Sequence, residues 1–158
     1  MLLECKCDAS FCADTNEGQI SAIVKEKGTR NYYLREKIGI SCLSSIQAEY
    51  LALHRLIKRV LDLQYHNIIP EETELRLYSD NKPVVDSVAY GQSVRGQYKS
   101  IVEDIRNNYS ILLNSNPGSK LLWVKRTKNK EAHRYLYGKK HAGRKLIEII
   151  PDQLRLDS

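Results

Sequence analysis

The feature that most limits the fold of this chain is a change in hydrophobic periodicity near residue 44. Before that point, three segments rich in β-branched, aromatic or alternating apolar residues are separated by polar turns, at 2–10, 19–26 and 31–42. This pattern predicts three strands of an antiparallel meander. After that point, apolar residues recur every three or four positions from Ile46 to Leu61, which is typical of a helix with one buried face.

The remaining segments extend the prediction to a complete α/β fold. The long helix runs from about 44 to 64, and Ser44 or Ser45 can cap it. Further strands are expected at 74–80 and 120–126, with helices at 81–90 and 97–115 and a last helix that begins near 127–130. Hairpin strands followed by crossover units predict a mixed five-stranded sheet flanked by helices. Strands one to three form the meander, and strands four and five are reached by helical crossovers.

The length of 158 residues is that of one domain, and no repeat or linker divides the chain. We expect a single domain over 1–158, with a core at about 2–140 and a C-terminal extension at about 141–158. It is open whether this extension folds as an extra element. No apolar run approaches the roughly 20 residues that span a bilayer. The expected state is a cytoplasmic monomer with no membrane contact.

The cysteines are expected to be reduced, because disulfides are rare in cytosolic chains. Their spacing does not match a zinc site, since "CKC" is too tight and no second pair follows. Cys5 and Cys7 share a strand face with Leu3, which favours a role as small core residues.

The net charge of +6 comes with two late basic clusters, at 125–130 and 138–145. A basic surface of this kind favours a polyanionic partner such as nucleic acid. Solvated surface lysines are the alternative explanation of the same charge.

Three acidic residues are predicted to lie at the edge of buried, apolar faces. Asp8 and Asp80 end the first and fourth predicted strands, and Glu49 falls about 60° from the centre of the apolar stripe of the long helix. A carboxylate at the edge of a buried face is costly unless something neutralises it. A partner lysine or a proton would do so. A divalent cation is the other alternative, because converging carboxylates suit Mg²⁺ or Mn²⁺.

Four motifs in this sequence resemble those of the type 1 ribonucleases H, in the order of that family. They are "DAS" at the end of the first strand, "SSIQAEYLAL" at the start of the long helix, "LYSDN" at the end of the fourth strand and "NKEAHRYLY" at the start of the last helix. The resemblance covers about 2–140, and "QAEYLAL" and "YSDN" are its most specific parts. It implies a ribonuclease H-like fold and hydrolysis of the RNA strand of RNA–DNA hybrids.

The resemblance also implies a catalytic site with two Mg²⁺ or Mn²⁺ ions, held by Asp8, Glu49, Asp80 and His133. Asp8 would bridge the ions, Glu49 and Asp80 would hold the ion near the leaving 3′ oxygen, and His133 would help to hold the ion that carries the attacking water. Products would carry a 5′ phosphate. The family usually has a carboxylate where this chain has His133, although some members, including certain retrotransposon enzymes, carry histidine.

Histidine must be neutral to bind a metal, and a helix start, with Asn129 as its expected cap, disfavours a positive charge on the ring. Imidazole also suits transition metals better than Mg²⁺. We therefore expect weaker Mg²⁺ binding and relatively better activity with Mn²⁺. The alternative is a surface histidine packed beside Tyr137.

Substrate recognition is expected to combine 2′-hydroxyl contacts with phosphate contacts. The candidates for nucleic-acid binding are Ser10, Asn81, Lys125, Arg126, Lys128 and Lys130. Two other functions stay open, because this fold hosts several chemistries. One is a catalytically weak ribonuclease H-fold module that binds nucleic acid, and the other is a different nuclease.

Overall fold

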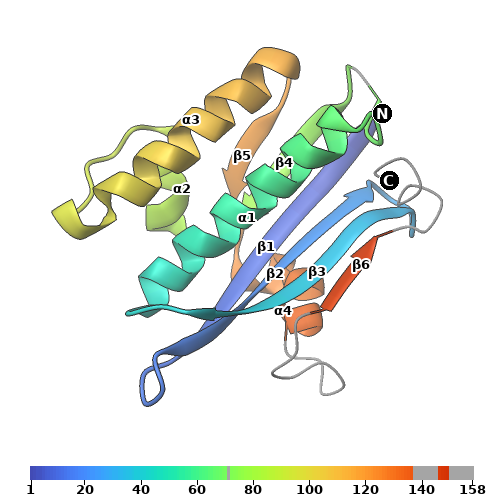
Figure 1. Cartoon of the computed structure of the whole chain (residues 1–158). Helices are drawn as coiled ribbons and strands as arrows, with labels where there is room; N and C mark the ends of the chain where they lie inside the picture. Colours follow the sequence, from blue (N-terminus) through green and yellow to red (C-terminus); the bar gives the residue numbers. More distant parts are fainter. Residues whose placement is uncertain (71, 137–145, 150–158) are drawn as a thin grey trace.

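The computed structural model of this chain describes residues 1–70, 72–136 and 146–149 (Figure 1). Within this part, six strands form one sheet in the order β5-β4-β1-β2-β3-β6. The strands are β1 (Leu2–Cys12), β2 (Glu17–Glu26), β3 (Tyr32–Ser41), β4 (Glu74–Ser79), β5 (Lys120–Trp123) and β6 (Leu146–Ile149).

The pairing confirms the predicted mixed sheet. Strands β1, β2 and β3 form an antiparallel meander, whereas β4 runs parallel to β1 and β5 runs parallel to β4. Part of the C-terminal extension adds a sixth strand to this sheet, because β6 pairs antiparallel with β3 at the sheet edge. The other residues of the predicted extension, 141–145 and 150–158, lie outside the described residues, and the single-domain organisation stays a prediction.

The helices also follow the expected order. They are α1 (Ser45–Tyr65), α2 (Lys82–Ala89), α3 (Lys99–Ser115) and α4 (Lys130–Leu136), with short 3-10 turns η1 (Gly96–Tyr98) and η2 (Arg126–Lys128). Ser44 caps α1 as predicted, because its Oγ accepts the Gln47 N–H at 3.1 Å. None of the described helices is both long and apolar enough to cross a membrane.

Strand β5 is shorter than predicted. It was expected to reach residue 126, but it ends at Trp123, and η2 begins at Arg126. Trp123 pairs with Ser79, the last residue of β4. Beyond it, β5 has no strand to pair with, so the chain leaves the sheet and turns toward α4.

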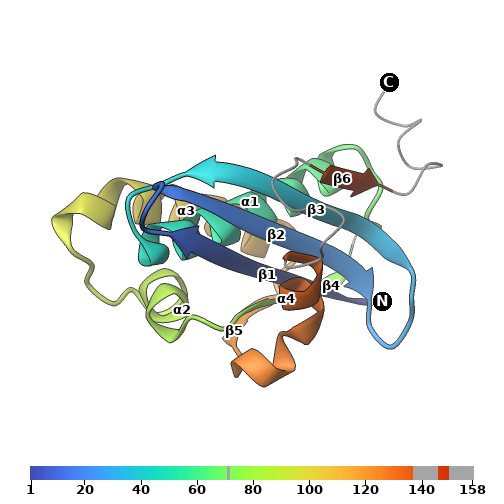
Figure 2. The ribbon, with the colours of Figure 1, turned by 90° about the horizontal axis from the view of Figure 1, so that it is seen from below.

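The two faces of the sheet carry different helices (Figures 1 and 2). Helix α1 buries Leu53, Leu56, Ile57 and Val60 against the apolar face of β1 and β2, and α3 packs beside α1. Each fully buried Leu or Ile side chain stabilises the fold by about 1.5–3 kcal/mol, so this layer fixes α1 relative to the sheet. The short helix α4 packs on the opposite face, against β1 and β2.

The cysteines behave as predicted. Cys5 and Cys7 are buried in the core beneath α1, and the thiols of all four cysteines in the chain are free.

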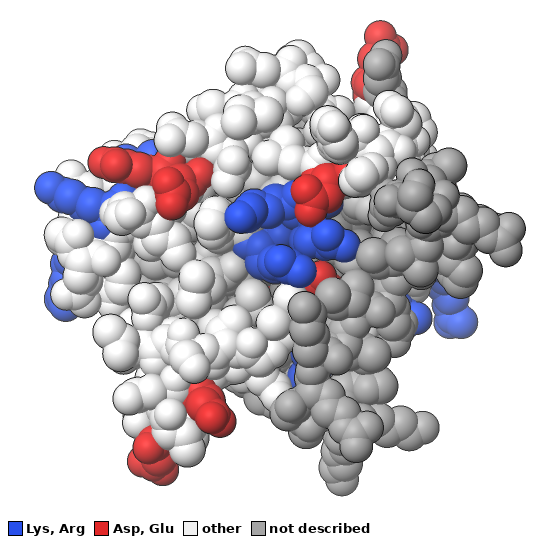
Figure 3. Space-filling model, viewed as in Figure 1, with Lys and Arg blue, Asp and Glu red and all other residues white. Residues whose placement is uncertain are grey.

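A buried carboxylate ties β3 to α1. Glu36 is 1% exposed and accepts hydrogen bonds from Arg55, one of them from Nη2 at 3.0 Å. The Nε of Arg59 lies 3.4 Å from the same carboxylate. Figure 3 shows that Lys and Arg side chains gather over α1 on this face, beside acidic atoms. At this point the basic surface is therefore part of a structural ion-pair network.

Glu36→Gln is expected to lower the free energy of unfolding by about 2–3 kcal/mol, because it leaves two guanidinium groups without their buried counter-charge. The partial exposure of both arginines keeps the loss below that of a fully buried pair. Urea unfolding measures this change. Glu74→Gln, which removes a half-buried carboxylate 3.7 Å from Arg76, is the control and should cost less than about 1 kcal/mol. Equal losses in the two variants would contradict the proposed role of Glu36.

Candidate metal centre

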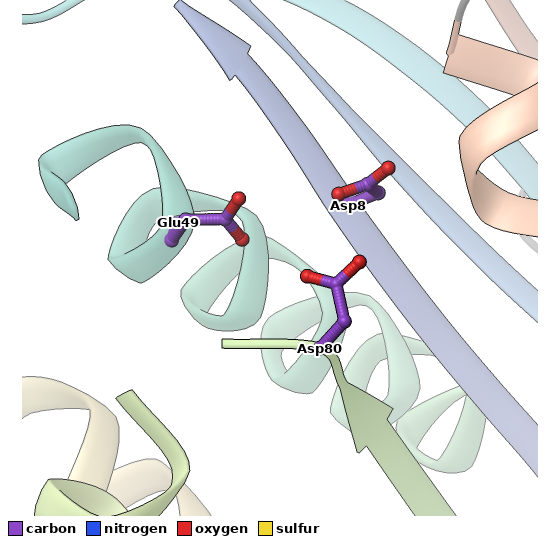
Figure 4. Close-up of side chains that lie close together, drawn as sticks. All are labelled: Asp8, Glu49 and Asp80. Atoms are coloured by element: carbon purple, nitrogen blue, oxygen red, sulfur yellow. The ribbon is translucent and has the colours of Figure 1, made fainter. Parts of the chain in front are cut away.

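Three carboxylates from distant parts of the chain converge at one point (Figure 4). Asp8, Glu49 and Asp80 each offer one oxygen, and these oxygens lie within 4.8 Å of one another. The parallel pairing of β1 and β4 ends at Lys6 and Tyr78. Asp8 and Asp80 each follow two residues later, so they hold equivalent positions just beyond the last pair.

Glu49 reaches this point from the first turns of α1. It lies between Ala48 and Tyr50, both of which are buried, and Leu53 one turn later is fully buried. The packing of α1 on β1 therefore turns this part of the helix toward the sheet. The structure thus brings together the three acids that the sequence singled out, and their role as metal ligands stays a prediction.

The protonation of these acids is strongly perturbed. Burial, with the charges of Asp8 and Asp80, raises the pKa of Glu49 to about 8. Burial and Asp80 also raise the pKa of Asp8, although the Ala9 N–H, at 2.9 Å, and His133 act in the opposite direction. Three carboxylates this close are not all ionised near neutral pH unless a cation joins them.

The donor set fits a divalent cation. Buried oxygens of Glu49 (Oε2) and Asp80 (Oδ2) have no hydrogen-bond partner. No described lysine pairs with these three carboxylates. Arg126 is 79% exposed, and its Nε lies 4.0 Å from Asp80 Oδ2. Unsatisfied hard oxygen donors of this kind suit Mg²⁺ or Mn²⁺.

His133 lies at the edge of this cluster. Its Nδ1 is 3.0 Å from Asp8 Oδ2, and its side chain is 42% exposed. It is not part of the group of ligand atoms that lie within 4.8 Å of one another among the described residues. The contact with Asp8 connects His133 to the cluster, and its role as a fourth ligand stays a prediction. Tyr137, the neighbour in the alternative explanation, lies outside the described residues.

Two buried polar side chains hold α4 beside the cluster. Asn129 is fully buried, and its Nδ2 donates to the Cys7 carbonyl at 2.8 Å, next to Asp8. Its backbone carbonyl accepts the His133 N–H at 3.2 Å. Ser21 donates its hydroxyl to the Ala132 carbonyl at 3.0 Å. Asn129 therefore starts the helix with its backbone, while its side chain anchors the helix to β1.

The sequence analysis expected Asn129 to cap this helix, but its side-chain Oδ1 has no hydrogen-bond partner among the described residues, so the side chain does not act as a cap. The sequence analysis missed the anchoring contacts of Asn129 and Ser21, and one more. The indole Nε1 of Trp123 donates to the Asp80 carbonyl at 3.0 Å and so fixes the backbone of that acid. The contact of Ser21 could have been suspected from the sequence, because Ser21 is a polar residue in an otherwise apolar stretch of β2. The contact of Trp123 depends on the register of β5 with β4, which the sequence pattern does not specify.

The predicted nucleic-acid-binding residues lie on three different parts of the structure. Ser10 lines a hollow of about 740 Å³ at the far ends of β1, β2 and β3. Asn81 caps α2, since its Oδ1 accepts the Val84 N–H at 3.1 Å. Exposed side chains in and around η2 belong to Lys125, Arg126, Lys128 and Lys130. Their contacts with nucleic acid stay predictions.

Comparisons with known proteins identify the family and the fold of this chain. A family model described as "Reverse transcriptase-like" matches residues 6–135. No curated protein sequence matches the chain significantly.

Solved structures of ribonucleases H are similar in fold. RNase H1 from Halobacterium salinarum is 14% identical, with a TM-score of 0.66 over 85% of this chain and 94% of that chain. The N-terminal RNase H domain of rv2228c from Mycobacterium tuberculosis is 17% identical, with a TM-score of 0.69 over 85% and 90%. LC11-RNase H1, isolated from compost by a metagenomic approach, is 17% identical in its complex with an RNA/DNA hybrid, with a TM-score of 0.64 over 84% and 92%.

At these identities the solved structures show the fold, and the family model covers most of the chain. The sequence-based prediction of a ribonuclease H-like fold is confirmed. The chain belongs to the reverse transcriptase-like family and has the fold of the type 1 ribonucleases H.

Proposed function

We propose that this protein is an endonuclease that hydrolyses the RNA strand of RNA–DNA hybrids and leaves 5′-phosphate products. The observation that carries the proposal is the convergence of Asp8, Glu49 and Asp80, each within a motif that resembles the family's catalytic motifs. The fold supports it, since LC11-RNase H1, which shares this fold, binds an RNA/DNA hybrid in its crystal structure.

Asp8, Glu49 and Asp80 would hold two divalent cations, Mg²⁺ or Mn²⁺, with His133 beside Asp8. Such ions, when bound, make an attacking water more acidic and stabilise the leaving oxygen. The protein holds these ligands in place before substrate arrives. The Ala9 N–H orients one oxygen of Asp8 and His133 contacts the other, while Trp123 fixes the backbone of Asp80.

Burial is the second contribution of the protein. Asp8 is 3% exposed, so little water competes for its oxygens. In the metal-free protein the raised pKa of Glu49 means that a proton occupies the cluster near neutral pH. Loading the site therefore releases this proton, because a carboxylate binds a cation in its ionised form.

The test is cleavage of a hybrid with a labelled RNA strand, with single-stranded RNA and duplex RNA as controls. We expect the protein to cut the hybrid but neither of the two control substrates. A chelator and the substitution Asp8→Asn should each abolish this cleavage. Cutting that survives in Asp8→Asn would show that another site or a contaminant is responsible.

A catalytically weak nucleic-acid-binding module is the second candidate, and His133 in place of a fourth carboxylate is the observation that favours it. Hybrid binding without metal-dependent cutting of any substrate would select this function over the first. Metal-dependent cutting of duplex RNA or single strands in preference to the hybrid would instead indicate a different nuclease on the same fold.

A further inference from the structure

A hollow lined by many charged side chains lies on the sheet face that carries α4. It has a volume of about 620 Å³, with a floor of side chains from β1, β2 and β3 and a rim from η2 and α4. Figure 2 shows α4 on this face, opposite α1 and α3. We call it the α4 pocket. Its cationic side chains are Lys6, Lys25, Arg35, Lys128, Lys130 and Arg134, and its lining contains one carboxylate, that of Glu131.

Glu131 organises the floor of the α4 pocket. Its Oε1 lies 3.1 Å from Lys25 Nζ and 3.6 Å from Lys6 Nζ, and its Oε2 accepts a hydrogen bond from the Tyr32 hydroxyl. The guanidinium of Arg35 stacks 4.6 Å from the centre of the Tyr32 ring, a distance typical of a cation–π contact. The cations of the floor are therefore held in place before any ligand binds.

The rim of the α4 pocket is different, because its cations have no counter-charge among the residues that the structure describes. Lys128, Lys130 and Arg134 are exposed, and no carboxylate of the described residues pairs with them. The described lining residues of the pocket include six cations and one carboxylate, so this part of the surface carries a positive excess. A surface of this kind attracts a polyanion.

The α4 pocket lies next to the candidate metal centre. Lys6 precedes Asp8 by two residues on the same face of β1, a separation of about 6.6 Å along a strand. The basic segment that contains η2 borders both sites, since Arg126 approaches Asp80 while Lys128 lines the pocket. Successive nucleotides of one strand rise about 3.4 Å, so a strand at Asp8 reaches the pocket within about two to four nucleotides.

We infer that the α4 pocket binds the sugar–phosphate backbone of the substrate strand where it extends beyond the cleaved bond. This inference rests on the proposed function for the identity of the strand, but it concerns binding and not chemistry. It adds Lys6, Lys25, Arg35 and Arg134 to the surface that the substrate contacts. A long hybrid therefore gains phosphate contacts that a short hybrid cannot make.

The test measures binding in an Asp8→Asn background, so that the outcome does not depend on whether the protein cleaves. Lys128→Ala/Arg134→Ala removes two rim cations, and Lys27→Ala/Lys58→Ala removes two exposed lysines elsewhere as a matched control. Fluorescence anisotropy gives the dissociation constant of a hybrid of about 18 base pairs over a range of salt concentrations. Circular dichroism and urea unfolding verify that both variants fold.

For the pocket variant we expect a dissociation constant about tenfold higher and a salt slope reduced by about 1–2, since each lost phosphate contact changes the slope by about 0.9. Equal weakening by the pocket and control variants on the long hybrid would overturn the inference. Loss of affinity for poly-glutamate with no loss for the hybrid would also overturn it, and would show that the pocket binds an acidic protein.

Discussion

Glu49→Gln is expected to reduce hybrid cleavage by at least about 10- to 100-fold, the loss typical when a hydrogen-bond partner of a metal ligand is removed, and at the same time to stabilise the metal-free protein above pH 8. The amide keeps the shape of the side chain but removes one ligand charge, which accounts for the loss of activity. It also removes a buried carboxylate that lies against Asp8 and Asp80, which accounts for the gain in stability.

The direction of this effect follows from the pKa of Glu49, which is about 8 in the folded protein and 4.5 ordinarily. The folded protein binds this proton more tightly than the unfolded chain does. The contribution of Glu49 to stability is therefore full below pH 4.5 and is lost as the pH rises through 8. Glutamine has no such loss, so we expect the variant to exceed the wild type by on the order of 3–5 kcal/mol at pH 9 and by little at pH 4.

Urea unfolding in the presence of a chelator, at pH 4 and at pH 9, measures the difference. Added Mg²⁺ or Mn²⁺ should raise the melting temperature of the wild type at pH 9 more than that of Glu49→Gln, because the cation then neutralises the cluster. Glu17→Gln, which changes an exposed acid at the start of β2, should change neither activity nor the pH dependence of stability. A Glu49→Gln variant that is less stable than the wild type at pH 9 would show that the cluster is not strained by like charges.

His133→Asp is expected to improve Mg²⁺-dependent cleavage and to destabilise the metal-free protein. The added carboxylate supplies the charge that the site lacks relative to the usual form of its family, so half-maximal activation should need about tenfold less Mg²⁺. The same carboxylate faces Asp8, whose Oδ2 now contacts His133 at 3.0 Å. In the absence of metal this new repulsion should cost on the order of 2 kcal/mol near neutral pH.

Titration of activity with Mg²⁺ and Mn²⁺, together with thermal unfolding in a chelator, tests both effects. His133→Asn serves as the control, because it removes the imidazole without adding a charge and should not lower the Mg²⁺ requirement. If His133→Asp leaves both the Mg²⁺ requirement and the metal-free stability unchanged, then the side chain at position 133 does not act on the cluster, despite the contact of His133 with Asp8. The expected preference of the wild type for Mn²⁺ would then lose its physical basis.

Much of the fold follows from local patterns in the sequence. The period-2 segments before residue 44 and the helical periodicity after it predict the meander and α1, and Ser44 caps α1 because its hydroxyl satisfies a free backbone N–H. The predicted end of β5 was wrong by three residues, because the end of this strand depends on where β4 stops and not on the residues of β5. The sixth strand was left open, because pairing at a sheet edge depends on a partner strand that lies far away in sequence.

By itself, the sequence determined the order of the elements, their apolar faces and the three acids at the edges of those faces. Each of these features depends on residues within a few positions of one another. Only the tertiary structure decided that Asp8 and Asp80 hold equivalent positions beyond the last β1–β4 pair, and that α1 turns Glu49 toward them. It also decided that His133 contacts Asp8 at the edge of the cluster. These distances join residues separated by 31 to 125 positions, so they depend on strand register and helix packing, which no local pattern specifies.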